Sequence, residues 1–184
     1  MNASRLPFWL AATMLAAGPV LAQAVLAQSA PLQPAVPQPV QAPAAPAAQG
    51  NTREILLQLG KRTISLRDNG KVIGSWPVAI GDPSTPTPVG RFTVQNKVVN
   101  PKYQSTKSGK INATVGPNGP LGDRWMGFQK SGPNQYGIHG TPSAWAWTVT
   151  SRAAVTNGCV RMLHEHVRKL FDLVDVGTPV IVQR

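Results

Sequence analysis

The chain lacks a second cysteine, since Cys159 is the only one among its 184 residues. A single thiol excludes an intrachain disulfide framework, and its late position excludes a lipid-modified cysteine near the N-terminus. Acidic residues are also scarce: seven Asp and Glu stand against eighteen Lys and Arg, which gives a formal net charge of +11 at pH 7. That charge attracts polyanions, either nucleic acid inside the cell or carboxylates and anionic headgroups outside it. A solvated basic face without a partner is the alternative.

The chain also lacks a long hydrophobic run. Its most apolar stretch, residues 8–22, is too short to cross a bilayer comfortably and follows a single cation, Arg5. Small-x-small patterns at its end are typical of a cleaved leader. We therefore expect residues 1–24 to be a signal peptide, cleaved between Ala22 and Ala27, and the protein to be exported to the periplasm or cell envelope. Export excludes nucleic acid as a partner, and an uncleaved anchor is the alternative.

Charge is absent from the next segment, and internal repeats are absent throughout. Residues 25–50 consist mainly of Pro, Ala and Gln. Proline fixes φ and removes a hydrogen-bond donor, so neither a helix nor a sheet ladder forms readily here. The composition predicts an extended, partly polyproline II, disordered tether. A disordered leader without a function fits the same composition.

The remaining residues, 51–184, form one domain by length, large enough to bury its own core. Alternating apolar residues and turn signals predict strands in its first half, and Asp-Asn-Gly at 68–70 is a strong hairpin signal. The predicted strands are residues 54–59, 62–67, 71–73, 76–80, 90–94 and 180–182. The Pro-rich residues 81–88 are expected to form a rigid loop.

One helix is predicted near the C-terminus. Val167, Leu170, Phe171 and Val174 recur at helical spacing within residues 164–174, and Gly-Thr-Pro at 177–179 is expected to stop the helix. The predicted fold class is therefore mainly β, a sandwich of mixed sheets with one C-terminal helix.

Two short elements carry the candidate chemistry. Cys159 lies in Thr-Asn-Gly-Cys-Val-Arg-Met at 156–162, and His139 lies in Tyr-Gly-Ile-His-Gly-Thr at 136–141. An exported lone thiol with a glycine-flanked histidine upstream is typical of a nucleophile and its base. Taken singly, the cysteine is a small buried hydrophobe and the histidine a structural one.

Residues 51–184 resemble the YkuD-type L,D-transpeptidase catalytic domain in five elements that occur in the same order. These elements are the hairpins around residues 68–70, the segments at 80–92 and 119–125, and the two motifs above. The resemblance implies a peptidoglycan enzyme. Cys159 would attack the third residue of a tetrapeptide stem, expel D-Ala, and pass the acyl group to an amine. Asn157 departs from the pattern, which often has His or Lys there.

The chemistry assigns further residues around the pair. Gly140 supplies a carbonyl that fixes the His139 tautomer. The amides of Gly158 and Cys159 are candidates for an oxyanion hole. Arg161 is either a salt-bridge partner or a ligand for a stem carboxylate. The expected substrate-binding residues are Thr156, Asn157, Gly158, Arg161, Tyr136 and Trp125. Trp145 and Trp147 are further aromatic candidates for a cleft, and packing in the core is the alternative for all four aromatic residues.

No cofactor and no metal are expected, because His164 and His166 stand two apart on a helix and diverge. The expected partners are peptidoglycan stem peptides, a lipoprotein as one acceptor, and carbapenem-type inhibitors. Two alternatives stay open: a hydrolase on the same scaffold (an L,D-carboxypeptidase or amidase), and a non-catalytic wall-binding module. The sequence does not distinguish a stem peptide, a lipoprotein, a D-amino acid or water as the acceptor.

Overall fold

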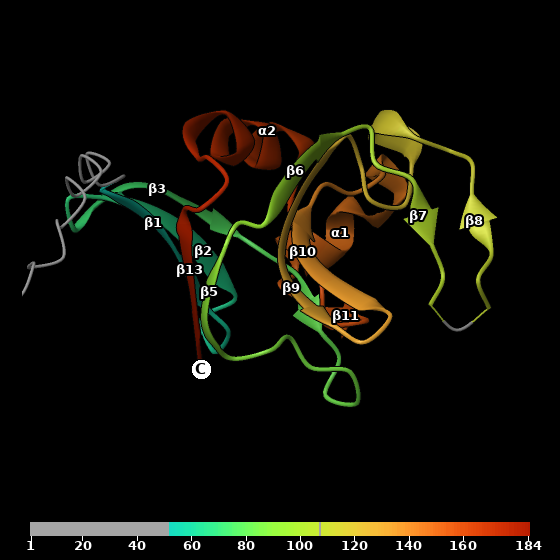
Figure 1. Cartoon of the computed structure of the whole chain (residues 1–184), viewed down its shortest axis with the longest axis horizontal. Coiled ribbons are helices and arrows are strands. Elements are labelled where there is room, and N and C mark those ends of the chain that lie inside the picture. Colours follow the sequence, from blue (N-terminus) through green and yellow to red (C-terminus); the bar gives the residue numbers. More distant parts are fainter. Residues whose placement is uncertain (1–51, 107) are drawn as a thin grey trace, which may run out of the picture. The chain divides into compact units, whose positions relative to one another are not determined.

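The computed structural model describes residues 52–106 and 108–184. The expected signal peptide and tether lie outside the described residues. The predicted class is confirmed: strands dominate, they form mixed sheets, and a helix stands near the C-terminus (Figure 1). Neither α-helix in the described part is long and apolar enough to span a membrane.

The larger sheet has five strands in the order β3-β2-β1-β13-β5. The N-terminal strand pairs in parallel with the C-terminal one and antiparallel with its sequence neighbour, so both ends of the domain meet at the sheet centre. The Asp-Asn-Gly hairpin forms as predicted, with Asn69 and Gly70 at φ 49° and 77°. The strands of this five-stranded sheet are β1 (Arg53–Gln58), β2 (Thr63–Asp68), β3 (Lys71–Pro77), β5 (Gly90–Thr93) and β13 (Pro179–Gln183).

The second sheet has four strands in the order β12-β10-β9-β6 and carries the candidate site. Two short pairs flank it, β4 with β11 and β7 with β8. The strands of the sheet are β6 (Asn96–Val99), β9 (Arg124–Ser131), β10 (Asn134–His139) and β12 (Val160–Arg161). The short pairs are β4 (Ile80–Gly81), β7 (Tyr103–Gln104), β8 (Ile111–Asn112) and β11 (Ala154–Thr156).

The C-terminal helix α2 (His164–Leu173) packs on the second sheet. Val167 and Leu170 are buried, as the helical spacing predicts, and Phe171 is half-buried against the core. The fold also contains a second, short helix, α1 (Ala146–Thr150), and two single 3₁₀ turns, η1 (Gly116–Asn118) and η2 (Ser143–Trp145).

The hydrophobic core lies between the two larger sheets and under α2. Residues of β1, β2 and β13 meet residues of β9, β10 and β12 there, which is the packing expected of a sandwich. Central members are fully buried: Ile55, Leu57, Ile64, Leu66, Met126, Phe128, Ile138, Val160 and Leu170.

Three local predictions need correction. Residues 76–80 are not one strand: β3 ends at Pro77, and Ala79 bridges to Arg161 before β4 begins. The Pro-rich loop starts one residue late, because Gly81 belongs to β4. The helix ends at Leu173, four residues before the Gly-Thr-Pro stop signal, and Pro179 instead opens β13.

A buried carboxylate, Asp123, ties the loop before β9 to the start of α2. Arg168 Nε donates to Asp123 Oδ2 at 2.6 Å, and the Arg124 guanidinium lies 3.1 Å from the same oxygen. His164 Nδ1 lies 3.1 Å from Oδ1, and its Nε2 lies 2.9 Å from the Pro117 carbonyl. These contacts, led by the Arg168 hydrogen bond among the favourable ones, oppose burial and lower the pKa of Asp123.

Candidate active site

The pairing of β10 with β12 brings the two candidate elements together. The strands are parallel, with Ile138 opposite Val160 and His139 opposite Arg161. Side chains alternate along a strand, and Ile138 and Val160 are fully buried in the core. His139, Arg161 and Cys159, one residue before Val160, therefore share the opposite face. Since adjacent strands lie about 4.8 Å apart, the thiol and the imidazole are near neighbours on that face.

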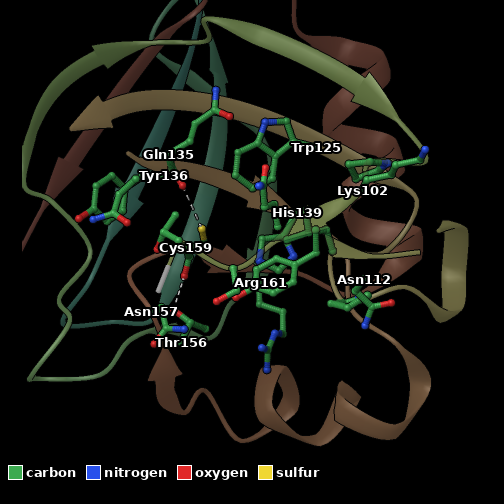
Figure 2. A pocket seen from close by; sticks show the side chains of 18 of the residues that line it. Lys102, Asn112, Trp125, Gln135, Tyr136, His139, Thr156, Asn157, Cys159 and Arg161 are labelled. Carbon is green, nitrogen blue, oxygen red and sulfur yellow. Dashed lines mark hydrogen bonds between the residues drawn. The ribbon is translucent and has the colours of Figure 1, made fainter. Parts of the chain in front are cut away.

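The His139 ring is held on the side away from Arg161 by Trp125. The two residues are opposite each other in the β9–β10 ladder, and their rings stack with centroids 6.0 Å apart and planes 20° apart. The indole N–H of Trp125 donates to Asn96 Oδ1 at 2.9 Å. The indole is thereby fixed as one wall for the imidazole (Figure 2).

The Gly140 carbonyl fixes the orientation of His139, as the sequence predicts. It lies 2.5 Å from Nδ1, so Nδ1 carries the proton in the neutral ring and Nε2 is left as the basic nitrogen. Burial, followed by the positive charge of Arg161, lowers the pKa of His139 to about 4. The ring is therefore neutral at pH 7 and able to accept a proton.

The loop before Cys159 is closed by Thr156. Its hydroxyl donates to the Cys159 carbonyl at 2.6 Å, while its own carbonyl accepts from the Asp82 N–H at 2.9 Å and the Thr85 hydroxyl at 3.0 Å. The Pro-rich loop after β4 thus supports the loop that presents the thiol. Thr156 borders the cleft, yet its hydroxyl is engaged inside the protein and not directed to a substrate.

Two backbone donors at this loop face no acceptor. Gly158 adopts φ +95°, a conformation that glycine tolerates, and this turns the chain sharply before Cys159. Within the described residues, the N–H groups of Gly158 and Cys159 donate to no other group. Backbone donors without a partner can stabilise an oxyanion, so the oxyanion hole stays a prediction for these two groups.

The Cys159 thiol is half-buried and donates to the Gln135 carbonyl, with sulfur and oxygen 3.8 Å apart (Figure 2). Burial raises the pKa of the thiol, against the opposing effects of a Gly137 backbone hydrogen bond and the Arg161 charge. No hydrogen bond joins Cys159 to His139 in the described chain. Catalytic hydrogen bonds are often long without substrate, so the pair is a neutral thiol beside a neutral base.

Arg161 is the third side chain on the face that carries His139 and Cys159. Its guanidinium stacks over the Trp145 ring at 5.1 Å, and Nη1 donates to the Thr148 hydroxyl at 3.1 Å. Its buried Nε has no hydrogen-bond partner, and no carboxylate of the described residues forms a salt bridge with it. The salt-bridge alternative for Arg161 is therefore not what the fold uses.

The side chains of His139, Cys159 and Arg161 line a cleft of about 1960 Å³. Small-molecule sites are typically about 300–1000 Å³, so this open cleft is larger than such a site. The lining includes residues of the Pro-rich loop, of β10 with the turn before it, and of β7 and β8. Figure 2 shows Tyr136, His139, Cys159 and Arg161 in this cleft. Its described lining contains three cations, Lys102, Lys110 and Arg161, and no Asp or Glu.

The remaining predicted residues fall into two groups. Tyr136, Asn157, Trp125 and Trp145 line the cleft with the catalytic candidates. Trp147 does not: it is 61% exposed on α1, outside the cleft, so its assignment as a cleft residue is wrong. No cluster of three or more metal-binding side chains occurs in the described residues.

Several residues that position the site could not be predicted from the sequence. Asn96 orients Trp125, and Thr148 holds Arg161, but single polar residues in strands and short helices carry no local signal. Asp123 is different, because a rare acid in a strongly basic chain is expected to attract cations.

The described domain matches one family model along almost its whole length. Residues 52–182 match the model named YkuD, the L,D-transpeptidase catalytic domain. Two proteins of Bacillus subtilis (strain 168) bear L,D-transpeptidase in their names and are similar in sequence. YqjB is 40% identical over 67% of this chain and 68% of its own length, and YkuD is 30% identical over 94% and 86%.

Solved structures agree with the fold. The C442S mutant of the Enterococcus faecium L,D-transpeptidase is 25% identical, with a TM-score of 0.56 over 72% of this chain. L,D-transpeptidase 3 of Mycobacterium tuberculosis, solved with a faropenem-derived adduct, is 21% identical with a TM-score of 0.59 over 73%. This chain spans 50% and 61% of those two chains, respectively.

Proposed function

The chain belongs to the YkuD family of L,D-transpeptidase catalytic domains, and from that premise we propose that it is a peptidoglycan L,D-transpeptidase with Cys159 as its nucleophile. The donor is a tetrapeptide stem, attacked at the carbonyl of its third residue. The observation that carries the proposal is the β10–β12 register, which sets thiol, imidazole and guanidinium on one face of a cleft.

The first half-reaction forms a thioester. His139 Nε2 takes the thiol proton as the sulfur attacks, because the ring is neutral and the thiol is protonated at rest. The carbon–nitrogen bond then breaks, His139 returns the proton to the departing nitrogen, and D-alanine leaves. The free N–H groups of Gly158 and Cys159 stabilise the oxyanion formed between these steps.

The second half-reaction releases the enzyme. An acceptor amine attacks the thioester carbonyl, His139 accepts its proton, and the carbon–sulfur bond breaks as the thiol is restored. The Gly140 carbonyl keeps Nε2 basic throughout, since it holds the proton on Nδ1. An open cleft beside the thiol supports the approach of a second substrate, whether a stem peptide, a lipoprotein or a free amino acid.

Purified protein incubated with tetrapeptide muropeptides tests the proposal. We expect a thioester mass on Cys159 and a new amide product, both identified by mass spectrometry. Release of D-alanine with only water as acceptor would instead indicate a hydrolase. Unmodified Cys159 and unchanged stems would exclude both activities.

Acylation by a carbapenem tests the catalytic pair separately. The faropenem adduct of a related fold supports β-lactams as thiol-directed inhibitors here. Wild-type protein should gain one drug mass on Cys159, and Cys159→Ser should lose it. His139→Ala should keep its fold by circular dichroism yet slow acylation by roughly two to four orders of magnitude, with partial rescue at high pH. Acylation of His139→Ala at the wild-type rate would remove His139 from the mechanism.

We also propose export to the periplasm or cell envelope, where peptidoglycan is found. The support is the composition of residues 1–24, a short apolar stretch after one cation and before small residues. Mass analysis of the N-terminus of cell-envelope protein should locate cleavage between Ala22 and Ala27. Full-length protein confined to the cytoplasm would overturn this.

A further inference from the structure

We propose that Arg161 binds the carboxylate of the amino acid whose nitrogen is bonded to the reacting carbonyl, first on the leaving residue and then on the acceptor. Arg161 thereby selects donors that end one residue after the scissile bond. It also selects acceptors that are α-amino acids, in preference to simple amines. This inference rests on the proposed function and identifies the acceptor class.

The first support is that Arg161 is held in place with hydrogen-bonding capacity to spare. Thr148 fixes one nitrogen, and the Trp145 ring covers one face of the guanidinium. A guanidinium has five N–H donors, and the described chain uses one of them. A guanidinium that is held in place and has unused N–H donors is suited to bind a carboxylate through two hydrogen bonds.

The second support is the charge of the cleft. Four half-buried or exposed arginines of the domain pair with carboxylates: Arg53 with Asp68, Arg67 with Glu54, and Arg124 and Arg168 with Asp123. Arg62 and Arg152 instead donate to backbone carbonyls at exposed positions. Arg161 lines a cleft that has no acidic residue among its described lining. A half-buried cation without a protein counter-charge is an unfavourable arrangement unless a ligand supplies the anion.

The third support is distance along the strand. Cys159 and Arg161 are two residues apart on the same face of an extended chain, which separates their Cα atoms by about 6.6 Å. In the donor, a terminal carboxylate lies one residue, about 3.3–3.6 Å, past the scissile carbonyl. With the carbonyl at the sulfur, that carboxylate is the substrate anion nearest to Arg161. A longer donor would place an uncharged amide there.

The chemical class of the acceptor follows because the second half-reaction is the reverse of the first with a different amine. The leaving group is an amine with a carboxylate on the same carbon. The acceptor nitrogen must occupy the position that the leaving nitrogen vacated. A carboxylate on the carbon next to that nitrogen then meets the same guanidinium. Free amino acids and diamino-acid side chains with that group satisfy this, whereas a lysine side chain does not.

The donor arm of the test compares two synthetic tetrapeptide stems, one ending in D-alanine and one in D-alaninamide. Release of the terminal residue gives kcat/KM for each. We expect wild type to favour the free carboxylate by roughly 10- to 150-fold, the range for a hydrogen bond to a charged group. In Arg161→Gln the preference should fall to about threefold or less, and Arg161→Lys should restore part of it because a point charge replaces a fork.

Lys130→Gln is the matched control, since it removes one positive charge from an exposed residue outside the cleft. It should keep the wild-type preference. A change in the ratio of the two donors, and not in one rate alone, separates carboxylate binding from a general effect on Cys159 and His139. Thermal unfolding of each variant checks the fold.

The acceptor arm uses D-alanine and D-alaninamide on the preformed thioester, at equal concentrations of free amine. Wild type should favour D-alanine, and Arg161→Gln should lose that preference. Equal wild-type rates in both arms, or a preference retained by Arg161→Gln, would overturn the role of Arg161. Absence of any thioester on Cys159 would instead overturn the proposed function, so the two failures are distinguishable.

Discussion

The Tyr136 ring lies against Gly158 so closely that a side chain at position 158 would collide with it. A Cβ built on Gly158 would stand 2.6 Å from Tyr136 Cε1 and 3.3 Å from the Pro86 carbonyl oxygen. Tyr136 belongs to β10 and Pro86 to the Pro-rich loop, so these two elements enclose the turn before the nucleophile. The turn that carries the Gly158 amide therefore has no room for a side chain.

We therefore expect Gly158→Ala to inactivate the enzyme and to destabilise the fold. Gly177 is a matched control, because it has the same φ of +95° but no atom within 4 Å of a built Cβ. Gly177→Ala should lose about 1–2 kcal/mol from the left-handed backbone alone. Gly158→Ala should lose about 1–3 kcal/mol more from overpacking. Equal unfolding free energies for the two variants, measured in urea, would contradict the packing argument.

Thr156 allows a second test of the nucleophile loop. Thr156→Val keeps the shape of the buried side chain but removes the hydroxyl that donates to the Cys159 carbonyl, so that this part-buried acceptor loses its bond. We expect a loss of about 1–3 kcal/mol in stability and a slower thiol acylation rate. Thr156→Ser retains the donor and should stay close to wild type in both measurements. If Val and Ser behave alike, the hydroxyl does not order the loop.

Much of the first half of the fold could be predicted because its signals are local. The Asp-Asn-Gly turn supplies the residues that a tight hairpin needs, and apolar alternation marks β1 and β2 on either side. β9 has no such signal, because Trp125, Met126, Gly127 and Phe128 are all buried and the alternation disappears. Helix α1 has five residues with β-branched members, too few for a periodic pattern.

The candidate site divides in the same way. Cys159, His139 and Gly140 could be predicted from short motifs, since their chemistry depends on residue type and on neighbours in the chain. The environment of Arg161 could not, because Thr148 and Trp145 reach it from α1 and η2 through tertiary packing. A single sequence gives no indication which hydroxyl or ring will meet a given guanidinium. Whether a cation is paired is therefore decided only by the fold.

Asn157 provides a prediction that follows from exposure. Its side chain is exposed at the cleft, and it is the residue that departs from the family pattern. The Asn157 amide adds no charge beside the thiol. A histidine at this exposed position would add little positive charge at neutral pH. We expect Asn157→His to change the acylation rate by less than about tenfold, or about 1.4 kcal/mol in barrier. A collapse of activity in kinetic assays would show that Asn157 contacts the reacting groups.

The lowered pKa of His139 should make the free energy of unfolding depend on pH. Its pKa in the folded protein is about 4, below the ordinary value of 6.5, because burial and the Arg161 charge disfavour the imidazolium. Between pH 6.5 and pH 4 the unfolded chain binds a proton that the folded protein does not. Stability is thus fully present above about pH 6.5 and falls as the pH drops towards 4.

Comparison with His139→Gln isolates this contribution, since glutamine keeps a polar side chain but does not titrate. Wild type should lose about 3 kcal/mol more than the variant between pH 7 and pH 4, the free energy of a shift of that size. Asp68, Asp82 and Asp123 have lowered pKa values, so their losses come at lower pH and are common to both proteins. Urea unfolding across this range measures the difference. Parallel stability curves for the two proteins would mean that the pKa of His139 is the same in the folded and unfolded states, which would contradict the argument from burial.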